Sequence, residues 1–138
     1  MADHPAPLLI TGASRGIGEA TARLFAQKGH RVALLARSVA AIESLANEIG
    51  GLAVPCDVAD EAAVRQAVHK SAAEFGGIGI VINNAGTLAP AARILDTDPK
   101  DWTRNIEPSG GSSRPECRVN RELSQRNRRA RRSVQCRG

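Results

Sequence analysis

The chain has 138 residues, which suffices for one modest domain and is too short for two. Apolar residues make up 42% of it and aromatic residues only 2%, so the core should be aliphatic. The net charge of +5 is unevenly spread. Residues 1–107 carry ten Lys and Arg against twelve Asp and Glu, whereas residues 108–138 carry nine Arg against two Glu. The basic character therefore belongs to the C-terminal segment.

Neither a membrane-spanning nor a secreted protein is expected from this sequence, and neither is a disulfide-linked or metal-binding one. No apolar run approaches the ~18 residues of a membrane span, and the N-terminus lacks the basic and apolar regions of a secretory signal. The three cysteines, Cys56, Cys117 and Cys136, are odd in number and widely spaced. They indicate a reducing, cytoplasmic location and predict neither a disulfide framework nor a metal site.

The first half of the chain alternates short apolar runs with helical periodicity. Residues 8–10 read as a buried strand, followed by a glycine-rich turn. A helix then runs to Lys28 and stops at Gly29; its expected apolar positions are Ile17, Ala20, Leu24 and Phe25. The uninterrupted apolar run 32–36 predicts a strand covered on both faces, as in a parallel sheet.

The same alternation continues to residue 82. Ser38 should cap a helix that Gly50 stops, and residues 52–54 begin a third strand. Asp60 should cap the next helix, and residues 78–82 form the fourth strand. This order predicts an α/β fold with a doubly wound parallel sheet.

The pattern stops at Pro108. A helix beginning near Pro99 would be ended there, because Pro disfavours a helical residue before it. We expect 1–107 to be a partial domain, truncated after its fourth strand, and 108–138 to be a disordered Arg-rich tail. The fourth strand should then be an exposed apolar edge, and the monomer should be marginally stable.

The glycine-rich turn carries the first functional signal. Gly12, Gly16 and Gly18 stand between a strand and a helix, where they permit a sharp turn and close approach. The N–H groups and dipole at a helix N-terminus favour a phosphate at this point. Such a turn can also be a plain strand–helix corner, but its strand–turn–helix–strand context favours dinucleotide binding.

Three motifs together resemble the short-chain dehydrogenase/reductase family. They are a Thr before GxxxGxG spacing at residues 11–18, Asp57-Val58 after the third strand, and Asn83-Asn84-Ala85-Gly86 after the fourth. The resemblance covers residues 8 to about 107. It implies a Rossmann-like fold and hydride transfer between a nicotinamide cofactor and an alcohol, ketone or aldehyde.

The resemblance also implies a role for each matching residue. The glycines and the N–H groups of Arg15 and Ile17 would cradle the pyrophosphate, and Thr11 would join the first and fourth strand ends. Asp57 would accept from the adenine amino group beside Val58, and Asn83, Ala85 and Gly86 would line the adenosine ribose. The expected cofactor-binding set is Thr11, Gly12, Ser14, Arg15, Gly16, Ile17, Gly18, Arg37, Asp57, Val58, Asn83, Ala85 and Gly86. A turn-capping Asp57 and a plain loop at 83–86 are the alternatives.

The choice of cofactor depends on Arg15 and Arg37. A protein that binds NAD places a carboxylate near the end of the second strand, but Arg37 stands there. Guanidinium groups at 15 and 37 suit a 2′-phosphate. We expect NADP(H) over NAD(H); the alternative is that Arg37 is a solvated loop residue.

The catalytic half of the resemblance is missing. The family uses a Tyr-x-x-x-Lys pair, and this chain contains no tyrosine. Its lysines, Lys28, Lys70 and Lys100, fall in helices around the expected cofactor. We therefore expect no catalytic residue, no identifiable substrate, no family oligomer interface, and no activity from this chain alone.

Two hypotheses address the tail. One is a shifted reading frame or truncated product joined at about Glu107–Pro108. The other is a non-catalytic nucleotide-binding protein with a nucleic-acid-binding arm, whose cations would be Arg126, Arg128, Arg129, Arg131 and Arg132. The arm ranks lower, because no aromatic residue is present there to stack on bases.

Overall fold

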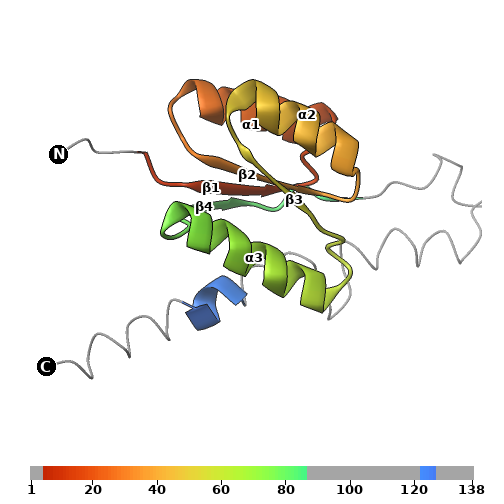
Figure 1. Ribbon diagram of the computed structural model, residues 1–138, viewed down its shortest axis with the longest axis vertical. Coiled ribbons are helices and arrows are strands. Elements are labelled where there is room, and N and C mark those ends of the chain that lie inside the picture. The colour runs from red at the N-terminus through yellow and green to blue at the C-terminus, as the bar shows by residue number, and fades with distance from the viewer. Residues whose placement is uncertain (1–4, 87–121, 127–138) are drawn as a thin grey trace, which may run out of the picture.

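The computed structural model describes residues 5–86 and 122–126 (Figure 1). Strands and helices alternate through residues 5–86, as the sequence predicts. They are β1 (Leu8–Thr11), α1 (Gly16–Gln27), β2 (Val32–Ala36), α2 (Val39–Ile49), β3 (Leu52–Pro55), α3 (Glu61–Phe75) and β4 (Ile80–Ile82). β4 begins two residues later than expected.

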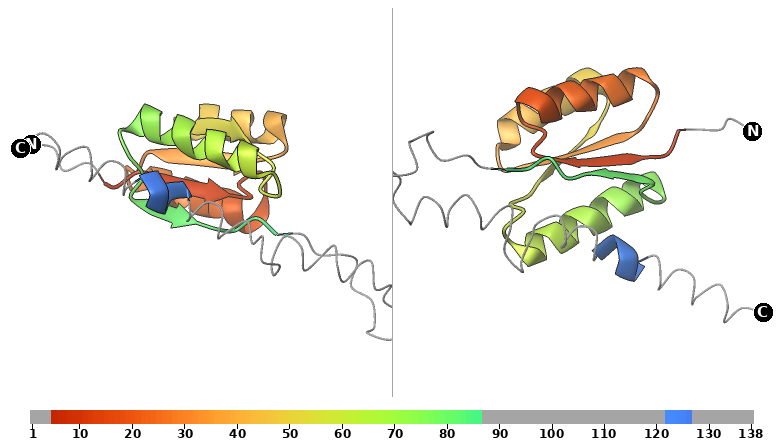
Figure 2. Two further views of the ribbon diagram at one scale, coloured as in Figure 1. Left: turned by 90° about the horizontal axis from the view of Figure 1, so that it is seen from below. Right: turned by 180° about the vertical axis from the view of Figure 1, so that it is seen from behind.

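The strands form one parallel sheet in the order β3-β2-β1-β4. Leu8 of β1 is in register with Val32 on one side and Ile80 on the other. α1 and α2 cover one face and α3 covers the other (Figures 1 and 2). The chain thus winds outward through β2 and β3 and then returns to the far side of β1. The doubly wound α/β fold is confirmed, and its switch point lies between β1 and β4.

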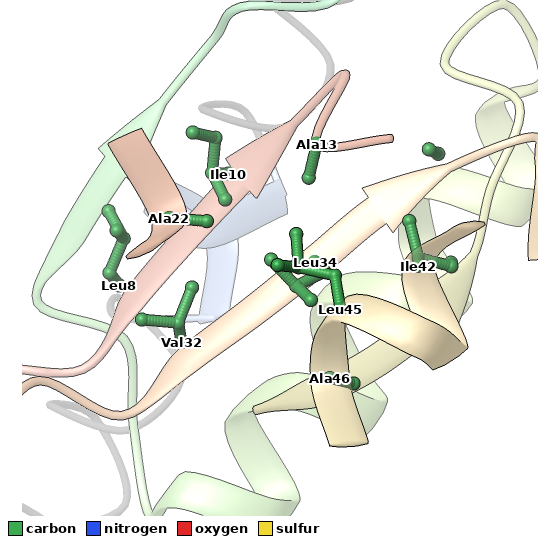
Figure 3. Close-up of a cluster of buried hydrophobic side chains, with 10 residues drawn as sticks. Leu8, Ile10, Ala13, Ala22, Val32, Leu34, Ile42, Leu45 and Ala46 are labelled. Carbon is green, nitrogen blue, oxygen red and sulfur yellow. The ribbon is translucent and has the colours of Figure 1, made fainter. Parts of the chain in front are cut away.

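An apolar cluster fills each face of the sheet. Leu8, Ile10 and Leu34 face α1 and α2, and Figure 3 shows this cluster. Leu9 and Leu35 face the opposite way, towards α3. Successive strand residues point to opposite faces, so strands covered on both sides read as uninterrupted apolar runs.

α1 packs through a different face from the one expected. Ile17 is 79% exposed and Leu24 is 50% exposed, whereas Ala22 is fully buried. Gly18 is buried beside it, and Phe25 is partly buried against the cluster. Small residues let the helix approach the sheet closely, and a search for large apolar side chains overlooks them.

The helix boundaries are mostly as expected. The Asp60 carboxylate accepts from the N–H groups of Ala62 and Ala63, at 2.8 and 3.2 Å. Gly50 and Gly76 end α2 and α3 with φ of 67° and 76°, where glycine is unstrained. Ser38 is the N-cap residue of α2, but the expected side-chain capping bond is not formed.

In the predicted tail, residues 122–126 are described and are helical. Leu123 packs against the cluster on the α3 side. The disorder expected for 108–138 as a whole stays a prediction. The rest of the tail and the helix expected near Pro99 lie outside the described residues. Within the described parts, no helix has the length and apolarity needed to cross a membrane.

Two Leu→Ala substitutions should separate core from surface. Leu34 is fully buried, so Leu34→Ala should lower the free energy of unfolding by about 2–5 kcal/mol. Leu24→Ala on the exposed side of α1 should change it by less than about 0.5 kcal/mol. Urea denaturation followed by circular dichroism measures both, and equal losses would contradict the packing described.

Candidate functional site

A buried hydroxyl joins the carboxyl ends of β1 and β4. Thr11 is 2% exposed, and its Oγ1 accepts from the backbone N–H groups of Asn84 and Ala85, both at 3.1 Å. The two strand ends are therefore held together at the switch point of the sheet. This is the contact expected for Thr11 from the sequence.

The glycine turn closes against the same strand end. Asn84 Nδ2 donates to the Gly12 carbonyl oxygen at 3.1 Å. A Cβ at Gly12 would lie 2.8 Å from Ala85 Cα, and one at Gly18 would lie 2.2 Å from the Gly12 oxygen. At Gly16 the backbone conformation, with φ of 58°, favours glycine. Gly12 and Gly18 thus allow close backbone approach, and Gly16 allows the turn.

The turn delivers the N-terminus of α1 to this edge of the sheet. α1 begins at Gly16, and its first-turn N–H groups, including that of Ile17, have no partner within the helix. Arg15 precedes it in an extended conformation with no side-chain cap, and Ser14 lies half-buried in the turn. The Ala13 N–H donates to the Leu35 oxygen at 3.3 Å, which fixes the turn to β2. Free donors and the positive end of the helix dipole suit an anion.

Two arginines border this edge. Arg37 directly follows β2 and is exposed, as is Arg15. Within the described residues neither guanidinium forms an ion pair, whereas Arg23 on α1 is held by Glu19 and Glu48. Arg15 and Arg37 are thus available to an anionic ligand.

Asp57 and Val58 follow β3 at the same end of the sheet. Asp57 Oδ1 accepts from the Ala59 N–H at 2.9 Å, so this carboxylate already shapes the turn into α3. That is the capping role considered as the alternative from the sequence. Val58 is half-buried. An adenine contact for Asp57 and Val58 remains a prediction.

Asn83 carries a buried side-chain oxygen. Its Oδ1 has no hydrogen-bond partner among the described residues. Buried acceptors are normally satisfied, so this atom calls for a donor from outside the described chain. The three residues after it differ: Asn84 and Ala85 bind Thr11, and Gly86 is exposed. The structural role of Asn84 was missed from sequence, although its place in a paired Asn motif was the available signal.

The described residues offer little acid–base chemistry near this edge. His30 precedes β2, at the opposite end of the sheet, and its Nδ1 lies 2.8 Å from the Ala6 oxygen. His69 on α3 pairs with Glu122. The described parts hold no group of three side chains that could bind a metal.

The sequence of the chain matches a family model described as short chain dehydrogenase over residues 7–109. This chain belongs to the short chain dehydrogenase family. D-threitol dehydrogenase of Mycolicibacterium smegmatis is 43% identical over 105 residues. The mitochondrial (-)-isopiperitenol/(-)-carveol dehydrogenase of Mentha piperita is 40% identical over 101 residues.

The fold has solved counterparts in the same family. The 3-ketoacyl-(acyl-carrier-protein) reductase of Brucella melitensis, solved with NADH, gives a TM-score of 0.80 at 33% identity over 87% of this chain. A Serratia marcescens short-chain dehydrogenase/reductase gives 0.76 at 30% identity over 88%. The matches cover 49% and 51% of those chains, and 39% of D-threitol dehydrogenase. The chain thus spans about half the length of these relatives or less.

The Thr11 hydroxyl can be tested by removal and by rescue. Thr11→Val leaves the Asn84 and Ala85 N–H groups without their acceptor, so it should cost about 1–3 kcal/mol of unfolding free energy. Thr11→Ser keeps the hydroxyl and should recover most of that loss. Chemical denaturation of the three proteins measures this, and similar losses in both variants would contradict a hydrogen-bonding role.

Cys56 should be chemically inert in the folded chain. Burial raises the pKa of its thiol to about 11, and the nearby Asp57 and Asp60 carboxylates act in the same direction. Because the thiolate is the reactive form, iodoacetamide at about pH 8 should spare Cys56 until the protein unfolds. Peptide mapping by mass spectrometry with and without urea tests this. Equal alkylation in both conditions would contradict it.

Proposed function

We propose that residues 5–86 form the cofactor-binding half of an NADP(H)-dependent short chain dehydrogenase. The observation that carries this is the glycine turn, closed against Asn84 and Ala85, which brings the free N–H donors of the α1 N-terminus to the carboxyl ends of β1 and β4. Asn83, with its unpartnered buried Oδ1, follows β4 at the same end of the sheet. Donors for phosphate oxygens and an acceptor for a ribose hydroxyl thus stand at one edge of the sheet. The residues present fit a dinucleotide.

The proposed binding roles follow the chemistry of each group. The first-turn N–H groups of α1, with Gly12, Gly16 and Gly18, hold the pyrophosphate. Asn83 accepts from the adenosine ribose, beside Ala85 and Gly86. Asp57 Oδ1 is engaged with the Ala59 N–H, so the second oxygen of Asp57 is the one offered to the adenine amino group.

The preference for NADP(H) is supported by charge. Arg37 occupies the end of β2, where a carboxylate would receive the 2′-hydroxyl of NAD. Neither Arg15 nor Arg37 is neutralised by a described carboxylate, so both can contact a 2′-phosphate. The Brucella reductase was solved with NADH, so the family likeness alone does not choose between the cofactors.

We propose binding without turnover for this chain. A bound nicotinamide cofactor would supply or accept hydride between an alcohol and a ketone or aldehyde. The described residues bind and orient, but the chain has no tyrosine to move the proton at the reacting oxygen. Two of the relatives are named as dehydrogenases of D-threitol and of (-)-isopiperitenol and (-)-carveol, so they do not point to one substrate.

The boundary near residue 107 is part of the same proposal. The family match ends at residue 109, which supports a junction close to Pro108 and a tail of other origin.

A reducing, cytoplasmic location is supported by Cys56, a buried free thiol in the described chain.

An Arg37→Asp substitution tests the choice of cofactor. The variant should weaken NADPH binding by about tenfold or more, because a charge-assisted phosphate contact is replaced by repulsion. NADH affinity should be unchanged or improved. Lys70→Asp on α3 makes the same charge change away from the site, so it serves as the control. Isothermal titration calorimetry measures each affinity, and an unchanged NADPH-to-NADH ratio would refute the preference.

A further inference from the structure

Residues 122–126 lie beside α3, outside the stretch that matches the family (Figures 1 and 2). We refer to them as the docked turn. Its position does not follow from the family match, which ends at residue 109. The contacts it makes with α3 therefore need their own explanation.

The first contact is polar. Glu122 is only 9% exposed, and its Oε1 lies 2.7 Å from Nε2 of His69. Its Oε2 lies 3.9 Å from Nε of Arg65, one turn earlier on α3. A carboxylate is seldom buried so far unless it is paired. A hydrogen bond with His69 and an ion pair with Arg65, on one face of α3, provide that pairing.

The second contact is apolar. Leu123 packs against the cluster between α3 and the sheet, which includes Val64 and Val68 of α3. Val81 of β4 packs against the same cluster and is itself half-buried. Leu123 therefore adds cover to the α3 side of a sheet whose last described strand is only partly buried.

The docked turn has one side towards solvent and one towards the protein. Ser124 and Gln125 are exposed, whereas Glu122 and Leu123 face the protein. One acidic and one apolar residue, adjacent in sequence, match a basic pair and an apolar cluster on α3. A polar and an apolar contact together define the position of the docked turn on α3 more narrowly than one apolar contact would.

We propose that the flank of α3 formed by Arg65, His69 and the adjoining cluster is a docking surface. Its occupant is this chain's own Glu122–Arg126 turn. The docked turn holds part of the basic tail against the domain and covers the α3 side of β4. Cofactor binding at the carboxyl edge of the sheet does not enter this assignment, so it stands apart from the function proposed above.

Hydrogen exchange on the full chain tests the docking. Amides of residues 122–126 should exchange about tenfold more slowly in the wild type than in Leu123→Ala. Alanine is the best helix former, so lost protection in that variant reports lost packing rather than lost propensity. Ser124→Ala, at an exposed position, is the matched control and should retain protection. Unchanged α3 protection in each variant shows that the domain is intact.

A double-mutant cycle tests the polar contact between Glu122 and His69. Glu122→Gln and His69→Gln should each reduce the protection of residues 122–126, and the double variant should lose less than the sum. Wild-type amides that exchange at the rate of an unstructured chain would overturn the proposal. So would unchanged protection in Leu123→Ala, or protection that rises with protein concentration, which would assign the turn to a second copy.

Discussion

The hydroxyl of Thr11 is the point on which the functional edge of this fold depends. It receives the N–H groups of Asn84 and Ala85 and so fixes the end of β4 against the end of β1. With the strand ends joined, the Asn84 side chain can reach the Gly12 carbonyl, and Gly18 can pack beneath it. These contacts set the direction of α1. They therefore also set where the N–H groups of its first turn point.

Local patterns predicted the elements because each pattern has one dominant physical cause. β2 is an uninterrupted apolar run because both of its faces are covered, and Gly50 and Gly76 end helices because their φ is positive. The candidate residues of the site were found for a related reason. They follow strands, and the carboxyl ends of parallel strands meet at one edge of a sheet.

Local patterns could not predict contacts between residues that are far apart in the sequence. The face on which α1 packs is set by how closely Gly18 and Ala22 approach the sheet, which periodicity of large side chains does not reveal. The Asn84 bridge and the His69–Glu122 pair join positions 72 and 53 residues apart. Ser38 had the right residue type for a cap, but a capping bond depends on rotamer and backbone geometry.

The two sides of α1 differ in what they contact. Its inner side, through Gly18 and Ala22, packs closely on the sheet and positions the glycine turn of the proposed cofactor edge. Its outer side leaves Ile17 and Leu24 exposed, and β4 is only half-buried. The matches cover 49% and 51% of the two solved relatives, so this chain spans about half of their length. Within residues 5–86, the proposed binding geometry rests on the contacts that join the ends of β1 and β4 with the start of α1.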